Sequence, residues 1–304
     1  MDSDDEVSYD SLTLSPLLFI DDLFRRTENV EAAHAGMIKM EQLAESKILD
    51  YNLTKTNYIV FGNKKKKEKI EKELESNPLK LYGSQINQSK CEKYLGWYIS
   101  EESLSDCSFR TVMKRKGKVT NAILQIKAII EDSRCERIGA LKSALNIWEC
   151  SVVPFLLYFA GYWIKIGMKT LKTLNDLQND FSLPLSMPIP ILYFDTKSLL
   201  MANRIWKMKI HLLFHLKNLP PTSLAKEVLI LQRNHHLPGL HEECQEMLNE
   251  LKIGDMKSYS KTQFKKELNK RIEEKNLTDL LRQIKSYKKL NHKEVSEEEY
   301  ELKS

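Results

Sequence analysis

The stretch Leu17-Leu-Phe-Ile-Asp21-Asp22-Leu23 sets two adjacent aspartates inside an apolar run. The surrounding segment, Leu12–Phe24, is short and contains a proline, so it predicts a strand, a tight turn and a second strand. Two carboxylates at the tip of a hairpin repel each other, and a Mg²⁺ ion, which prefers oxygen ligands, relieves that repulsion. Mg²⁺ ions held by aspartates catalyse phosphoryl and nucleotidyl transfer. On the dipeptide alone, an aspartate that caps a helix or closes a turn is the commoner case.

The residues that follow predict a helix over Glu28–Leu49, with Thr27 or Asn29 as its cap. Its apolar stripe, at helical spacing, consists of Val30, Ala33, Met37, Met40 and either Leu43 or Ala44. Such a stripe faces a core, so this helix is expected to cover the strands around it.

Short strands are predicted on the far side of this helix. Tyr58–Phe61 is the first, and Gly62-Asn63 closes it. Lys64–Lys67 begin a charged, solvated loop that leads into a short helix over residues 68–75, and further strands cover residues 79–82 and 93–100. The sequence therefore predicts an α+β unit with a small antiparallel sheet.

From Phe109 onward the pattern is nearly all helical. The predicted helices cover residues 109–132, 134–149, 153–166, 169–180, 199–219, 223–233, 240–251 and 262–286. Prolines punctuate the loop around residues 184–190 and the later joints. The fold class is therefore α+β, with an α-helical second part.

Composition excludes several classes of protein. With 304 residues, 42% of them hydrophobic, the chain is neither wholly disordered nor fibrous. Its 5 widely spaced cysteines argue against a disulfide framework and against a zinc module, so we expect no zinc. The acidic N-terminus is no presequence, and the longest apolar run, Val152–Ile164, reads as a buried core helix too short for a membrane span. We expect an intracellular protein of the nucleus or cytoplasm, without a membrane partner.

Three segments, in order, resemble motifs of reverse transcriptases from non-LTR (LINE-type) retrotransposons. Phe19-Ile-Asp21-Asp22-Leu23 looks like the [FY]-x-D-D hairpin called motif C. Asn52-Leu-Thr-Lys55-Thr and the strand after it look like motif D, and KYLGWYIS at Lys93–Ser100 looks like motif E, the primer grip. More weakly, Trp148–Trp163 and Leu174–Phe181 resemble the thumb region of these elements.

The resemblance implies an organisation along the chain. Residues 12–105 would be a partial polymerase palm, residues 106–182 a helical thumb and residues 183–293 a C-terminal helical region. Residues 1–11, with five acids and no base, would be disordered, and residues 294–304 would form an acidic tail.

The resemblance also implies roles for single residues. The catalytic set would be Asp21, Asp22 and Lys55. Both aspartates would bind Mg²⁺, and the lysine would protonate or neutralise the leaving pyrophosphate. The primer grip would consist of Tyr94, Leu95 and Gly96. There the glycine permits a sharp turn and a close approach of the backbone to the primer. The alternative for Lys55 is a solvated loop lysine, and the alternative for Tyr94 is ordinary core packing of a strand.

Two departures from the pattern bear on activity. Ile20 stands where the related enzymes most often have alanine, next to the expected primer terminus. Only 20 residues precede Asp21, which leaves no room for the fingers, motif A and motif B. We therefore expect a C-terminal fragment of an RNA-directed DNA polymerase that cannot hold two metals and extends no primer alone. In the intact parent, the RNA template, DNA primer, dNTP and Mg²⁺ would be bound.

Clustered bases predict contact with nucleic acid. The first cluster lies at the start of the thumb and consists of Arg110, Lys114, Arg115, Lys116 and Lys118. Such a stripe would bind phosphates of the primer–template duplex without reading sequence. Residues 257–293 carry 12 bases and 4 acids, net +8, and are either a second surface or an ordinary solvated helix. The alternative function is a non-catalytic, helical nucleic-acid-binding remnant of such an element.

Overall fold

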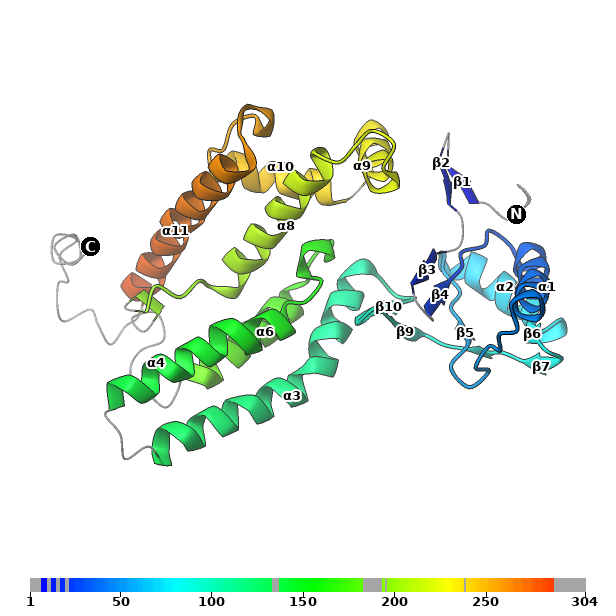
Figure 1. The fold of residues 1–304 in the computed structure, drawn as a ribbon, viewed down its shortest axis with the longest axis horizontal. Helices are drawn as coiled ribbons and strands as arrows, with labels where there is room; N and C mark the ends of the chain where they lie inside the picture. Colours follow the sequence, from blue (N-terminus) through cyan, green and yellow to red (C-terminus); the bar gives the residue numbers. More distant parts are fainter. Residues whose placement is uncertain are drawn as a thin grey trace. The chain divides into compact units, whose positions relative to one another are not determined.

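The computed structural model describes residues 7–9, 12–14, 17–19, 22–132, 137–182, 193–194, 196–237 and 239–286. These residues form a mostly helical α+β chain, as predicted, whose short strands pair two by two (Figure 1). The chain divides into two compact units: unit 1 is residues 1–111 and 163–167, and unit 2 is residues 112–162 and 168–304. Within the described ranges, every helix is too short or too polar to cross a membrane.

Unit 1 contains the described strands. The antiparallel pairs are β1 (Val7–Tyr9) with β2 (Leu12–Leu14), β3 (Leu17–Phe19) with β4 (Asp22–Phe24), β6 (Lys80–Leu81) with β7 (Ser84–Gln85), and β9 (Cys91–Tyr94) with β10 (Trp97–Ser100). β5 (Asn57–Tyr58) and β8 (Asn87–Gln88) pair in parallel. The small antiparallel sheet expected from the sequence is thus realised as separate pairs, one of them parallel.

The N-terminal segment differs from the expectation of disorder over residues 1–11. β1 (Val7–Tyr9) pairs with β2, and Val7 lies opposite Leu14. Valine and tyrosine favour strands, and the apolar Leu-Thr-Leu that follows supplies a partner strand. The expectation of disorder rested on the five acids of residues 1–11, which surround this short β-forming pattern.

Helix α1 (Val30–Lys47) begins two residues after the predicted Glu28. Of the two possible caps, Asn29 is the one used, because its side chain accepts a hydrogen bond from the backbone N–H of Ala32 at 2.7 Å. Of the two possible stripe residues, Ala44 is buried and Leu43 is exposed. The core of unit 1 that this helix covers consists of Val30, Val60, Leu74 and Leu79, with Ala33, Met37, Tyr58 and Ile70 packed against it.

Helix α2 (Lys64–Ser76) begins at Lys64, so the expected loop over Lys64–Lys67 is wrong. The Asn63 side chain accepts from the backbone N–H of Lys66 at 3.0 Å and caps the helix. Lys67 is not solvated either, because its Nζ donates to the Glu101 carbonyl at 2.9 Å. Four lysines in a row therefore start a helix here, with Asn63 as the cap and with Lys64 paired to Glu68 one turn on at 3.9 Å.

Unit 2 is helical. Its helices are α3 (Leu104–Asp132, which starts in unit 1), α4 (Arg137–Ile147), α5 (Val153–Leu156), α6 (Met168–Ser182), α8 (Met201–Lys217), α9 (Leu224–Asn234), α10 (Leu240–Glu250) and α11 (Lys261–Ser286). Helix α3 begins before the predicted Phe109, because the Ser103 hydroxyl accepts from the backbone N–H of Asp106 at 3.1 Å. The boundaries of α8 to α11 agree with the prediction within two residues.

One core cluster of unit 2 joins α8, α9, α10 and α11, which lie together in Figure 1. Phe214 of α8 stacks on Phe264 of α11 with ring centroids 4.0 Å apart. Buried amides also connect α8 to α11: Asn276 Oδ1 accepts from the backbone N–H of Leu200 at 2.9 Å and from Asn203 Nδ2 at 3.0 Å. Buried polar groups that are satisfied in this way fix how the helices meet.

The apolar run Val152–Ile164 is not the buried helix that the sequence predicts. A π-helical turn (Trp148–Val152) leads into the single turn α5, and a 3₁₀ turn follows at Ala160–Tyr162. Between them Phe159 adopts φ 67°, a left-handed conformation that no regular helix contains. The interruption leaves aromatic residues of this run on the surface.

Candidate functional site

The aspartate hairpin is present in the described residues as the antiparallel pair β3–β4, in which Leu17 lies opposite Phe24 and Phe19 opposite Asp22. Asp21 and Ile20 lie outside the described residues. The Asp22 side chain is exposed, so its carboxylate is accessible to a cation. Carboxylate oxygens suit Mg²⁺. Within the described ranges, no group of three or more His, Cys, Asp or Glu residues could hold a metal ion.

The predicted primer grip is a second hairpin rather than one strand. β9 and β10 pair with Tyr94 opposite Trp97, so Leu95 and Gly96 form a two-residue turn. Both have positive φ, 48° for Leu95 and 84° for Gly96, as a type I′ turn requires. A sharp turn is therefore present at Gly96, as expected, and it divides the strand expected over residues 93–100 into parts of two strands.

An aromatic contact joins the two hairpins. The rings of Phe24 in β4 and Tyr94 in β9 have centroids 5.3 Å apart, with planes tilted by 44°. The backbone N–H of Tyr98 in β10 donates to Thr111 Oγ1 at 3.1 Å, which anchors the second hairpin on the first turns of α3. Segments far apart in the sequence thus form one cluster within unit 1.

Lys55 lies in a polar loop. The Asn52 side chain accepts from the backbone N–H of Thr54 at 3.1 Å, and the Asn52 carbonyl accepts from the backbone N–H of Lys55 at 3.0 Å. These bonds fold Asn52–Thr56 into a turn that presents the Lys55 side chain to solvent. The loop is ordered by its own side chains, and the lysine is available to bind an anion.

The basic stripe of α3 separates into two kinds of residue. Lys114, Lys116 and Lys118 are exposed. Arg115 is only 7% exposed, and its Nη1 donates to the carbonyls of Leu156 and Tyr158 at 2.9 Å each. Arg110 forms ion pairs with Asp106 and Glu102, and hydrogen bonding to Asp106 raises its pKa. Three of the five predicted phosphate-binding residues are thus free of these structural contacts.

Ion pairs also occupy much of the described part of the second basic stretch. On α11, Lys270, Arg271, Lys275 and Arg282 pair with acids of the same helix or, for Lys275, also with Glu250 of α10. These contacts favour the reading of α11 as an ordinary solvated helix surface.

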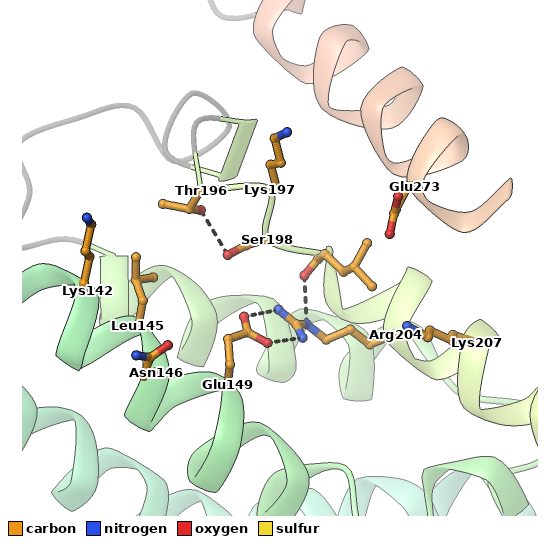
Figure 2. A pocket seen from close by; sticks show the side chains of 11 residues that line it. Lys142, Leu145, Asn146, Glu149, Thr196, Lys197, Ser198, Arg204, Lys207 and Glu273 are labelled. Carbon is orange, nitrogen blue, oxygen red and sulfur yellow. Dashed lines mark hydrogen bonds and ion pairs between the residues drawn. The ribbon is translucent and has the colours of Figure 1, made fainter. Parts of the chain in front are cut away.

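A pocket of about 570 Å³ lies in unit 2 between α4, residues 196–199, α8 and α11 (Figure 2). Arg204 spans it, donating to both carboxylate oxygens of Glu149 at 2.7 and 2.6 Å and through Nε to the Leu199 carbonyl at 2.9 Å. Burial lowers the pKa of Lys207, and the nearby Glu273 carboxylate opposes that shift. No motif pointed to these residues, because they come from four separate segments.

No protein-family model, curated protein or solved structure matches the chain.

Proposed function

We propose that this chain is a segment of a reverse transcriptase of the non-LTR kind, running from motif C through the thumb, and that it binds an RNA–DNA primer–template. The contact between Phe24 and Tyr94 carries the proposal, since it joins the aspartate hairpin to the hairpin of the primer grip. Two motifs recognised separately in the sequence would need to be neighbours in order to act on one primer terminus.

Each site residue then has a chemical task. Asp21 and Asp22 would bind Mg²⁺, which supplies charge stabilisation for the phosphoryl group being transferred, together with the further carboxylates of a complete palm. Lys55, exposed on its ordered turn, would neutralise or protonate the leaving pyrophosphate. The turn at Leu95-Gly96 has no Cβ on its second residue, so the primer backbone could approach closely there.

The exposed lysines of α3 would hold the duplex. Lys114 and Lys118 are four residues apart and therefore lie on one side of the helix. Contacts of this kind give affinity without sequence preference, and they weaken with salt because bound counterions are released. Arg115 takes no part, since its guanidinium is committed to backbone carbonyls.

The test is fluorescence anisotropy with a DNA primer annealed to an RNA template, titrated at several salt concentrations. We expect Lys114→Gln and Lys118→Gln each to lower the salt slope by about 1. Lys72→Gln replaces an exposed lysine on α2 and should change nothing. Affinity that ignores salt, or no binding at low salt, would refute the proposal.

The second candidate is a non-catalytic, helical nucleic-acid-binding remnant of such an element, in which the aspartate hairpin takes no part in binding. The observation that favours it is the exposed α3 lysines, which would bind phosphates whatever the hairpin does. Asp22→Asn separates the two. If the hairpin faces the primer terminus, removing its charge strengthens duplex binding in the absence of divalent ions, and Mg²⁺ abolishes the difference. A remnant that binds through α3 alone would show the same affinity for both proteins.

A further inference from the structure

One short segment of unit 2 carries four aromatic side chains, here called the ring cluster: Phe155, Tyr158, Phe159 and Tyr162. Tyr158 and Phe159 have ring centroids 4.9 Å apart, and Phe159 and Tyr162 have centroids 5.1 Å apart. Phe155, Tyr158 and Tyr162 are 43%, 52% and 50% exposed. Large apolar rings that gather on a surface usually mark a binding site.

Contacts from Arg115 of α3 hold the ring cluster in place. Arg115 of α3 donates to the carbonyls of Leu156 and Tyr158, and its guanidinium carbon lies 5.9 Å from the Phe155 ring centre and 5.7 Å from that of Tyr158. The backbone N–H of Tyr162 donates to the Phe159 carbonyl at 2.9 Å. These contacts fix the segment that bears the rings, so little ordering remains to be done when a ligand binds.

The opposite side of the same segment packs on α8. A Cβ on Gly161 would lie 3.4 Å from Leu212 and 3.5 Å from the Met208 carbonyl, so the backbones approach closely there. Phe159 has φ 67°, a conformation that is costly for an aromatic residue. The segment is therefore clamped between α3 and α8, with backbone strain retained at the residue that joins the rings.

The electrostatic surroundings of the ring cluster are positive. Neither residues 107–130 nor residues 150–175, the two stretches that meet at Arg115, contain an acidic side chain. Lys118 is exposed and lies three residues from Arg115, within one helical turn of that buried residue. An apolar protein partner or a lipid tail would not need these cations, whereas a polyanion with flat apolar groups would use both features.

We propose that the ring cluster is a stacking platform for unpaired nucleobases of a single-stranded nucleic acid, with Lys114 and Lys118 holding the neighbouring phosphates. Aromatic rings accept any base, because every base has a π-face, so the site is tolerant of sequence. The inference rests on the proposed function only in taking nucleic acid as the ligand. It adds a single-stranded segment, bound in unit 2, to the duplex of that function.

The experiment compares two oligonucleotides of equal length and charge, one with bases and one with abasic positions throughout. A 2-aminopurine in the first reports stacking by fluorescence quenching. We expect Tyr158→Leu and Tyr162→Leu each to weaken binding of the base-containing strand about tenfold and to reduce quenching, with abasic binding unchanged. Tyr82→Leu makes the same change at an exposed tyrosine of unit 1 and should bind as the native chain does.

Circular dichroism establishes that each variant folds. If one tyrosine variant fails to fold, the other still tests the proposal. Equal affinity of the native chain for both oligonucleotides would overturn the platform, as would variants that lose abasic binding equally. The duplex titration that tests the proposed function does not depend on the rings of Tyr158 and Tyr162. Salt-dependent duplex binding without base-dependent binding of the single strand refutes this inference and leaves the proposed function intact.

Discussion

Arg115 and the lysines beside it form one basic run in the sequence, but Arg115 is buried in the structure and the lysines are exposed. The run from Arg110 to Lys118 reads as one basic stripe, yet Arg115 lies on the buried face of α3 between Val112 and Val119. The spacing of these three positions follows the helical repeat and could have identified the arginine as inward-facing. What the sequence could not show was its acceptors, two carbonyls some forty residues further along.

Replacing Arg115 by alanine should destabilise the protein by about 2 to 4 kcal/mol, because it leaves the carbonyls of Leu156 and Tyr158 without their charged donor. Urea denaturation measures the loss. Lys114→Ala, one residue away but exposed, should stay within about 0.5 kcal/mol of the native chain. Equal stability of the two variants would show that the buried hydrogen bonds contribute little.

The Cys244 thiol should be unreactive at neutral pH, and its contribution to folding stability should depend on pH above about 9. Burial raises the pKa of its thiol from 9.0 to about 12. The folded state therefore keeps a proton that the unfolded chain releases, so this contribution to stability is complete below about pH 9 and is lost as pH rises towards 12. In the folded protein at neutral pH, iodoacetamide should modify the exposed Cys150 and leave Cys244 untouched. Modification of both at similar rates would contradict the burial.

At the scale of elements, prediction succeeded where local signals agree and failed where a cap or a contact decides. The hairpin β3–β4 was predicted from an apolar run broken by two aspartates, and α1 from a stripe and a cap. The starts of α2 and α3 were misplaced because Asn63 and Ser103 were not recognised as caps. The run Val152–Ile164 was misread because apolar composition alone does not reveal the break at Phe159.

Replacing glycine by alanine should have opposite effects on stability at two positions, Gly96 in the turn of β9–β10 and Gly117 inside α3. Gly96 has φ 84°, so Gly96→Ala should destabilise the hairpin by about 1 to 2 kcal/mol. Gly117 lies inside α3, and an added Cβ would meet nothing within 4 Å, so Gly117→Ala should stabilise by up to about 1 kcal/mol. Chemical denaturation of both variants checks this, and two shifts of the same sign would argue against the turn.

Two core clusters of the described residues, one in each unit, differ in size. The cluster of unit 2 around Phe214, Phe264 and Leu268 joins four helices, whereas the cluster under α1 in unit 1 has four buried members. Buried apolar area is the dominant stabilising term. The helical second part follows from the sequence pattern, but the membership of each cluster depends on contacts between distant segments.

Hydrogen exchange should therefore distinguish the units. Backbone amides of α8 and α11 should exchange more slowly than those of α1 and α2, because opening them exposes the larger core. Mass spectrometry of peptides from each helix provides the comparison within one sample. Equal or stronger protection of α1 and α2 would show that the small core of unit 1 is the more stable of the two.

In the proposed function, the aspartate hairpin β3–β4 and the hairpin β9–β10 meet one primer terminus. The direct test places a photoreactive thiothymidine at the 3′ end of a DNA primer annealed to RNA and maps the crosslink by mass spectrometry. Trypsin releases residues 1–25, which contain the aspartate hairpin, and residues 94–110, which contain Tyr94, the turn and β10 of the second hairpin, because cleavage follows Arg25, Lys93 and Arg110. We expect crosslinks in these two peptides, and we expect them to disappear when the crosslinking group lies at the 5′ end. Crosslinks confined to unit 2, or spread evenly over the chain, would contradict it.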